Sequence, residues 1–241
     1  MSILNKIIET KKTEIEICKK NNSFSDLEKF KDFNRNTNSL SKSLINSDFG
    51  IISEFKRKSP SKSVINNNSS VDKVIKGYEN AGVCGISILT DNKYFGGSSK
   101  DLVIARNNTH LPILRKEFII DEYQIHEAKA LGADAILLIA SCLKKETIRN
   151  FSQFAKNLGL EVLIEIHNIN ELDNCLIDSI NIIGVNNRNL KTFEVDIQTS
   201  KDLAKFIPKE FVKISESGLT NKREIMELVD YGFEGFLMGE N

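Results

Sequence analysis

The sequence carries no excess of charge of either sign. Lys and Arg together number 33 among its 241 residues, and Asp and Glu also number 33. A chain without net charge lacks the overall field that recruits nucleic acid or an anionic membrane surface. We therefore expect a small-molecule partner, with no nucleic acid and no membrane.

Cysteine is also scarce, and no two cysteines are close in the sequence. The four are Cys18, Cys84, Cys142 and Cys175, and no CxxC spacing occurs. Disulfide frameworks and zinc sites usually show such paired spacings. We expect four reduced thiols in helical or apolar surroundings.

The sequence contains only three histidines, His110, His126 and His167, and they fall in three different segments. No group of His, Cys and Asp has the spacing of metal ligands, so no metal site is expected. The histidines are interpreted as structural or solvent-exposed. Whether His167, which lies just beyond Glu165, touches a functional site is left open.

Long apolar runs are absent as well. Residues 1–20, MSILNKIIETKKTEIEICKK, alternate apolar and charged residues at helical spacing. A signal peptide or a membrane span needs a continuous apolar segment instead. We therefore expect a cytoplasmic protein. The GxGxxG and Walker motifs of nucleotide-binding folds are missing too.

From about residue 48 onward, short apolar runs alternate regularly with amphipathic stretches. The runs lie at 50–57, 86–91, 111–118, 135–141, 161–166, 182–187, 212–217 and 235–239. The helical patterns lie near 71–81, 98–107, 121–131, 144–158, 169–178, 196–206 and 220–231. Eight such strands match a closed parallel barrel better than an open sheet. The predicted fold is α/β, a (β/α)8 TIM barrel that forms one domain over residues 1–241.

Both ends of the chain differ from a plain barrel. Residues 1–47 are predicted to form an N-terminal helical extension, which covers either the bottom of the barrel or the active-site mouth. No helical pattern follows the run at 235–239, so the final helix of the barrel is expected to be missing.

Charged residues stand where the predicted odd-numbered strands end. Glu54 and Lys56 end the first strand, Lys116 ends the third and Glu165 ends the fifth. Because side chains alternate along a strand, all four share the inward face of their strands with apolar residues. Two lysines and two carboxylates crowded at a barrel mouth shift one another's pKa, which suits acid–base catalysis.

Small residues follow the predicted strands seven and eight, where barrels commonly hold a phosphate group. Ser217 and Gly218 follow strand seven, and Gly239 follows strand eight. The KSPSK segment after strand one adds Ser59 and positive charge, and Pro60 stiffens its path. The alternative is that these Gly and Ser residues only make turns.

The motifs together resemble those of the indole-3-glycerol-phosphate synthases of tryptophan biosynthesis. The resemblance extends from about residue 3 to residue 240. It rests on IISEFKRKSPSK, ISILTDNKYFGGSSKDL, LPILRKEF, LIEIHNINEL, IGVNNRNLKTFEVD, ISESGL and FLMGE, in that order. The resemblance implies a carboxy-lyase without cofactor or metal. Its substrate would be the phosphorylated 1-(2-carboxyphenylamino)-1-deoxyribulose 5-phosphate, whose indole ring the enzyme closes with loss of carbon dioxide and water.

The resemblance also implies roles for the charged residues. Lys116 is similar in position to the general acid that protonates the substrate ketone. Lys56 would pair with the substrate carboxylate or assist the dehydration. Glu165 would act in the dehydration as acid or base. Glu54 would orient the lysines and hold the developing cationic nitrogen.

Further site residues follow from the same motifs. Asn186 and Arg188 would position carboxylate and hydroxyl groups, and Ser217 would lie near the sugar. Phe95 and Phe118 would form an apolar wall against the anthranilate ring. The remaining substrate-binding residues implied are Ser59, Gly218 and Gly239 as a phosphate cradle, together with Pro60 and Glu216.

Two substitutions depart from the family pattern. Glu117 and Asn189 stand where Asp is usual, so hydrogen bonds around the site are expected to be rearranged. The missing final helix, whose amino terminus normally helps to hold the phosphate, is expected to weaken substrate binding.

Two other readings of the barrel stay open. The first is phosphoribosylanthranilate isomerase, which would use a Cys and an Asp at strand ends, although no Cys occupies such a position. The second is a noncatalytic barrel or one half of a bifunctional polypeptide. We expect a monomer, with a fusion to or complex with another tryptophan-pathway enzyme as the alternative.

Overall fold

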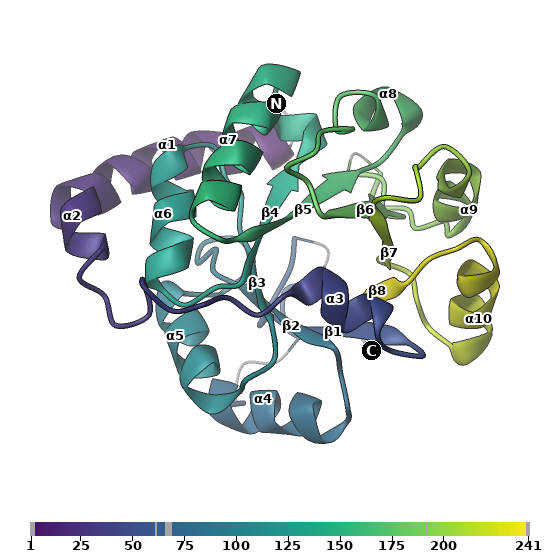
Figure 1. Ribbon diagram of the computed structural model, residues 1–241, viewed down its shortest axis with the longest axis horizontal. Coiled ribbons are helices and arrows are strands. Elements are labelled where there is room, and N and C mark those ends of the chain that lie inside the picture. Colours follow the sequence, from purple (N-terminus) through teal and green to yellow (C-terminus); the bar gives the residue numbers. More distant parts are fainter. Residues whose placement is uncertain (1–2, 61, 66–68, 191, 240–241) are drawn as a thin grey trace.

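A computed structural model describes residues 3–60, 62–65, 69–190 and 192–239, and it is a closed barrel of eight parallel strands (Figure 1). The strands are β1 (Gly50–Phe55), β2 (Gly85–Leu89), β3 (Ile113–Lys116), β4 (Ala135–Ile139), β5 (Glu161–Ile166), β6 (Ile182–Asn186), β7 (Val212–Glu216) and β8 (Gly235–Met238). Each strand pairs with the next, and β8 pairs with β1 through Gly235 opposite Gly50. The predicted (β/α)8 barrel and its eight strands are confirmed.

Helices surround the barrel and lie in the intervals between strands, as predicted. They are α4 (Val71–Asn80), α5 (Ser99–Asn108), α6 (Glu122–Ala130), α7 (Lys145–Asn157), α8 (Ile169–Leu172), α9 (Gln198–Ala204) and α10 (Lys222–Asp230), with a 3-10 turn η1 (Ala140–Cys142) after β4. The helices α8 and α9 are shorter than the predicted ranges 169–178 and 196–206. Within the described residues, which end at Gly239, no helix follows β8.

Alternate side chains of the strands belong to two apolar layers, one inside the barrel and one between the barrel and the helices. Inside the barrel, Ile52, Leu114 and Leu163 pack together with no exposure to solvent. Outside it, residues such as Ile86 and Ile136 pack against the helices. This alternation fixes which side chains point inward at the carboxyl ends of the strands.

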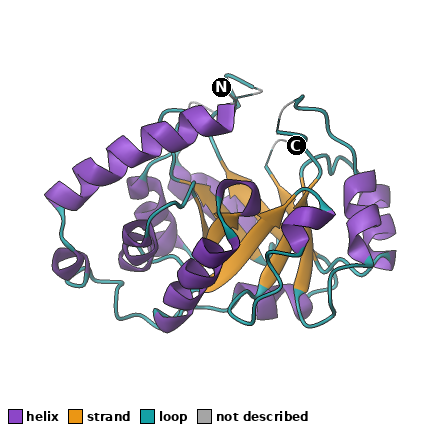
Figure 2. Ribbon diagram, turned by 90° about the horizontal axis from the view of Figure 1, so that it is seen from above, coloured by secondary structure: helices purple, strands orange, loops and turns teal. Residues whose placement is uncertain are grey.

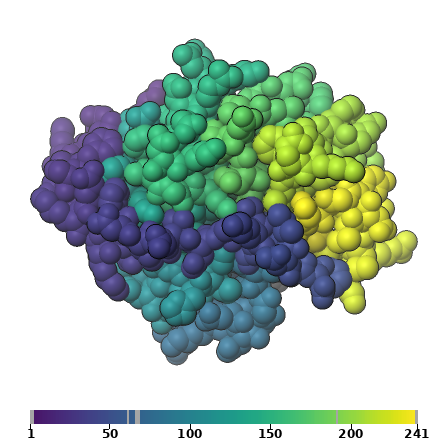
Figure 3. Space-filling model, in the orientation of Figure 1, coloured from purple at the N-terminus to yellow at the C-terminus, as the bar shows by residue number. Residues whose placement is uncertain are grey.

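The N-terminal extension closes the amino-terminal end of the barrel. The helix α3 (Leu40–Ile45) inserts Leu40 and Leu44 among the inward-facing strand residues. Strands begin with glycine here because a Cβ at Gly85 would lie 2.4 Å from Leu40 Cδ1. In Figure 3 the extension, purple to dark blue, crosses the visible face to its centre, where α3 lies.

The same extension also covers part of the opposite end. The helix α1 (Ile3–Asn21) runs along the side of the molecule that carries both chain ends (Figure 2). Its Ile3, Leu4 and Ile7 line the cavity at the carboxyl ends of the strands. A short helix α2 (Phe24–Leu27) packs against α6 before the chain turns toward α3. The extension therefore covers both the bottom and the mouth, which the sequence presented as alternatives.

No helix in the described part of the chain is both long and apolar enough to cross a membrane. The side chains of Cys18, Cys84, Cys142 and Cys175 are free thiols.

Candidate active site

A half-buried lysine between two carboxylates forms the centre of the candidate site. The ammonium group of Lys116, at the end of β3, donates a hydrogen bond to Glu216 Oε2. The same nitrogen lies 3.3 Å from Glu165 Oε2. Glu165 comes from β5 and Glu216 from the end of β7, so three odd-numbered strands bring these groups together.

A second pair stands beside this centre on β1. Lys56 Nζ donates to Glu54 Oε1 at 2.9 Å, and Ser87 Oγ donates to Glu54 Oε2 at 3.2 Å. Glu54, Glu165 and Glu216 are all at least nine-tenths buried. Inward placement of the four predicted charged residues follows their strand parity, as expected.

The buried charges shift one another's titration. Burial favours the neutral form of Lys116, but Glu216 and Glu165 outweigh it and raise the pKa of its ammonium group. Burial works against ionised Glu165 too, yet Lys116 and then His167 lower its pKa. Burial raises the pKa of Glu216 to about 7, with Lys116 opposing and Glu165 adding to the rise. The centre thus combines a charged donor, an ionised carboxylate and a carboxyl that titrates near neutral pH.

These groups open into one cavity with about 1230 Å³ of empty space, part of it continuous with solvent. Every site residue predicted from the sequence lines it. They are Glu54, Lys56, Ser59, Pro60, Phe95, Lys116, Phe118, Glu165, Asn186, Arg188, Glu216, Ser217, Gly218 and Gly239. A cavity that combines apolar side chains with a few charged and polar groups is the usual kind of site for a small molecule.

One wall of the cavity is apolar. The rings of Phe95 and Phe118 lie 5.9 Å apart between centroids and are tilted by 38°. Ile3 and Ile7 of α1 add further apolar side chains to the lining of this cavity. A planar aromatic group is the kind of ligand that such a surface accepts.

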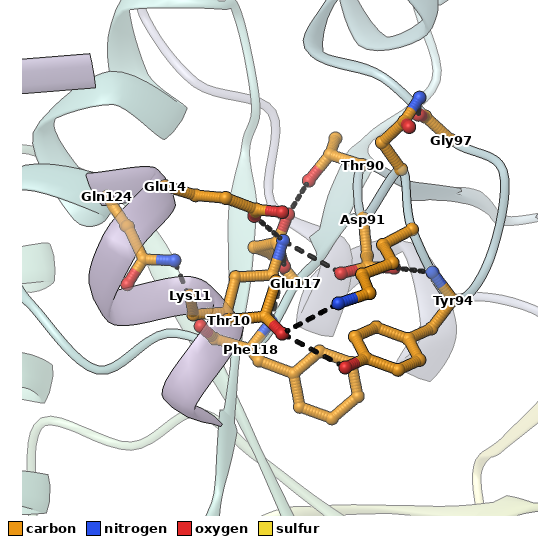
Figure 4. A network of polar contacts seen from close by, with 12 residues as sticks. Thr10, Lys11, Glu14, Thr90, Asp91, Tyr94, Gly97, Glu117, Phe118 and Gln124 are labelled. Atoms are coloured by element: carbon orange, nitrogen blue, oxygen red, sulfur yellow. Dashed lines mark hydrogen bonds and ion pairs between the residues drawn. The ribbon is translucent and has the colours of Figure 1, made fainter. Parts of the chain in front are cut away.

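A buried ionic contact holds α1 against this wall (Figure 4). Lys11 Nζ lies 2.8 Å from Asp91 Oδ2 and 3.1 Å from Glu117 Oε1. Asp91 Oδ1 accepts the backbone N–H of Phe95 at 3.1 Å, and Glu117 Oε1 accepts that of Phe118 at 2.8 Å. The two carboxylates therefore tie the helix to both loops that carry the aromatic wall.

The two departures from the family pattern are accommodated differently. Glu117 reaches Lys11 and also accepts a hydrogen bond from Thr90 Oγ1 at 2.7 Å. Asn189 Oδ1 accepts the backbone N–H of Thr192 at 3.2 Å, within the turn after β6. Glu117 thus belongs to the contact between α1 and the barrel, and Asn189 belongs to a surface turn.

The loops after β6 and β7 bring the backbone close to the charged centre. Asn186 hydrogen-bonds to Glu165 and accepts the backbone N–H of Arg188 at 2.9 Å. A Cβ on Gly184 would lie 2.4 Å from Glu216 Oε1, so only glycine leaves room for that carboxylate. Directly after β7, Ser217 has a φ of 67°, which is unusual for a residue with a side chain and marks a constrained turn.

The residues considered for phosphate lie on the rim of the same cavity. Ser59 Oγ accepts the backbone N–H of Lys62 at 3.1 Å, which closes a tight turn after β1. Gly239 packs against Glu54, because a Cβ there would lie 2.8 Å from the Glu54 Cβ. Gly218 follows Ser217 with a φ of 77°.

Sequence reasoning missed part of this site. Spacing predicted an acid–base group of Glu54, Lys56, Lys116 and Glu165. It left out Glu216, which only the family resemblance supplied. The same parity rule, applied to Glu216 and Ile214, would have found it. The contribution of Ile3 and Ile7 had no comparable signal, because apolar helical spacing does not say which surface a helix covers.

No group of three or more His, Cys, Asp or Glu side chains within the described ranges could hold a metal ion.

A closed (β/α)8 barrel with lysines and buried carboxylates around a cavity at the carboxyl ends of its strands is the arrangement typical of (β/α)8-barrel enzymes. Solved structures share the fold. An N-acetylmannosamine-6-phosphate 2-epimerase from Clostridium perfringens matches with a TM-score of 0.60 at 14% identity, over 84% of this chain and 90% of that one. An HpcH/HpaI aldolase from Desulfitobacterium hafniense matches with a TM-score of 0.63 at 11% identity, over 83% and 90%.

Sequence comparisons define the family. The family model described as indole-3-glycerol phosphate synthase matches residues 4–241. An indole-3-glycerol phosphate synthase from Bacteroides thetaiotaomicron is 44% identical over 99% of this chain and 91% of its own length. One from Caldanaerobacter subterraneus subsp. tengcongensis is 40% identical over 99% and 92%. The chain belongs to the indole-3-glycerol phosphate synthase family of tryptophan biosynthesis, which confirms the family predicted from its motifs.

Proposed function

We propose that this chain is a carboxy-lyase that converts 1-(2-carboxyphenylamino)-1-deoxyribulose 5-phosphate into indole-3-glycerol phosphate. The observation that carries the proposal is Lys116, which lines a cavity with an apolar wall and lies between Glu165 and Glu216. A charged donor held by two carboxylates, beside a surface for an aromatic ring, is what the closure of an aromatic amine onto a ketone requires.

The first step is the formation of the carbon–carbon bond. The ring carbon that bears the carboxylate attacks the ketone carbon while Lys116 donates a proton to the ketone oxygen. Phe95 and Phe118 hold the ring flat against the wall, 5.9 Å from each other between centroids. Carbon dioxide then leaves, because its loss restores the aromatic ring.

The second half is dehydration. Lys56, held by Glu54 at 2.9 Å, first binds the substrate carboxylate and then donates a proton to the hydroxyl, which leaves as water. Glu165, which the neighbouring Lys116 and His167 keep ionised by lowering its pKa, accepts the proton lost from the carbon next to the nitrogen, which completes the indole ring. Glu54 faces the nitrogen on which positive charge develops.

The remaining polar residues bind the rest of the substrate. Asn186 and Arg188 are assigned the carboxylate and hydroxyl groups, and Ser217 the sugar. The phosphate is assigned to the rim formed by Ser59, Gly218 and Gly239, with Pro60 shaping the loop after β1.

The test is product formation by the purified chain. Indole fluorescence should rise on addition of the carboxyphenylamino substrate, with one carbon dioxide released for each indole formed, and a chelator should leave the rate unchanged. Phosphoribosylanthranilate, the substrate of the isomerase alternative, should not be converted. Absence of indole formation by well-folded protein would contradict the proposal and favour a noncatalytic barrel.

A further inference from the structure

His167 stands between the candidate base and a second carboxylate outside the cavity. It follows β5 directly, and its side chain is 13% exposed. Nε2 lies 3.5 Å from Glu165 Oε1, while Nδ1 lies 3.1 Å from Glu171 Oε2. The imidazole thus faces the Glu165 oxygen that Lys116 does not contact, because Lys116 approaches Oε2.

Glu171 is itself firmly placed. It lies in α8, and its Oε2 also accepts the backbone N–H of His167 at 2.8 Å. Asn168 caps the helix by accepting the backbone N–H of Glu171 at 3.1 Å, and its amide donates to Glu171 Oε1 at 2.8 Å. The cap of a four-residue helix therefore fixes the carboxylate that orients the imidazole.

The surroundings favour a charged imidazole. Burial alone would lower the pKa of His167, but the hydrogen bond with Glu171 and the negative charge of Glu165 raise it above its ordinary value. Within the described residues Nε2 makes no hydrogen bond, so its contact with Glu165 is electrostatic. The titratable and charged groups around this carboxylate–imidazole–carboxylate row are Glu165, Lys116 and Glu216 in the barrel, Cys142 after β4, Glu171 in α8, Cys175 beyond α8 and Lys145 in α7.

We propose that His167 is a positioning residue for Glu165: its imidazolium, anchored by Glu171, holds the Oε1 oxygen of that carboxylate in place and keeps the carboxylate ionised. This inference rests on the role proposed above for Glu165. His167 keeps its proton during turnover. Its positive charge acts on Glu165 electrostatically, through the Oε1 oxygen.

The experiment compares pH–rate profiles of His167→Gln and Glu171→Gln with the wild type. Without the imidazolium, Glu165 protonates more readily, so the acid midpoint of kcat should rise by about one pH unit in His167→Gln. At a fixed pH below the midpoint, kcat should therefore fall about tenfold, and raising the pH should restore it. Glu171→Gln should shift the midpoint in the same direction by less.

Control measurements distinguish a shift of the acid midpoint from a structural defect. His110→Gln removes an exposed histidine and should leave the profile unchanged. Thermal unfolding of each variant reports the fold. A loss of kcat that is equal at every pH, with an unmoved midpoint, would show that His167 only supports the loop and would overturn the inference.

The underlying role of Glu165 is tested separately by Glu165→Gln. If Glu165→Gln lacks turnover while His167→Gln keeps the wild-type midpoint, the positioning role of His167 is wrong and the proposed function stands. If Glu165→Gln retains wild-type turnover, the role proposed for Glu165 is wrong and the inference about His167 is overturned with it.

Discussion

Lys116 and its two carboxylates show how single residues acquire their chemistry from distant parts of the chain. Glu216 contacts Lys116 across 100 positions of sequence. Two carboxylates that share one ammonium group in a buried space cannot both hold their charge equally well, so their pKa values move apart. Glu165 moves down and Glu216 moves up.

Glu216 should therefore make stability depend on pH. Its pKa lies above that of a carboxyl in an unfolded chain, so its protonated form contributes stability at acid pH, and this contribution is lost as the pH rises from 4.5 through about 7. Glutamine does not titrate, so we predict that Glu216→Gln removes this decrease in stability with rising pH. The measurement is urea unfolding of both proteins at pH 4 and at pH 8. The free energy of unfolding of the variant minus that of the wild type should be larger at pH 8 than at pH 4, by up to about 3 kcal/mol.

The control is Ile45→Ala, which removes an exposed apolar side chain and no titratable group. It should leave the pH dependence of unfolding as in the wild type. If Glu216→Gln and the wild type respond to pH in parallel, Glu216 does not titrate in this range.

Strand parity predicted the residues of the centre better than it predicted their partners. Ile52, Leu114 and Leu163 identify the inward face, and this placed Glu54, Lys116 and Glu165 correctly. The contact of Glu165 with His167 was left open because His167 lies beyond the strand, where the two-residue period no longer determines direction. Which carboxylate meets Lys116 depends on barrel closure, which no local pattern contains.

At the scale of elements, the extension is the part that the sequence described least well. The spacing in residues 1–47 indicated helices, but an apolar helical face fits either end of a barrel. Contacts with distant residues decide the matter. Lys11 meets Asp91 and Glu117 at the mouth, whereas Leu44 enters the barrel at the other end.

Removal of Lys11 should loosen both α1 and the aromatic wall. Lys11→Met leaves Asp91 and Glu117 buried without their cation, which typically costs about 3–5 kcal/mol. We predict a lower thermal midpoint and a KM raised roughly tenfold, since the wall binds the ring in ground and transition states alike.

Lys12→Met is the control for the α1 contact. Lys12 is exposed and pairs only with Glu9 in the same helix among the described residues, so stability should change by less than about 0.5 kcal/mol. Lys11→Arg should recover part of the loss. An unchanged KM in Lys11→Met would mean that α1 does not support the site.

Leu44 should matter for stability without mattering for turnover. It is fully buried in the amino-terminal end of the barrel, so Leu44→Ala should lower the free energy of unfolding by about 2–5 kcal/mol. Its neighbour Ile45 is 56% exposed, and Ile45→Ala should have little effect. Denaturant unfolding and kcat on the same samples check both statements. A large fall in kcat for folded Leu44→Ala would contradict the separation.

At the scale of the whole molecule, the two ends of the barrel differ in what they contain. The amino-terminal end is packed with apolar side chains from α3, and the carboxyl-terminal end carries the charged cavity. The strands and their order were predictable because buried parallel strands are continuous apolar runs. The ends of α8 and α9 were not, because the apolar period continues past the residues where the helices stop.

The central claim is that Lys116 supplies the proton for ring closure. Single-turnover kinetics with enzyme in excess, followed by indole fluorescence, isolates that chemistry from product release. We predict that Lys116→Ala slows the single-turnover rate by a hundredfold or more, the usual order for loss of a general acid, while Lys12→Ala matches the wild type. A Lys116→Ala rate within a few-fold of the wild type would contradict the account.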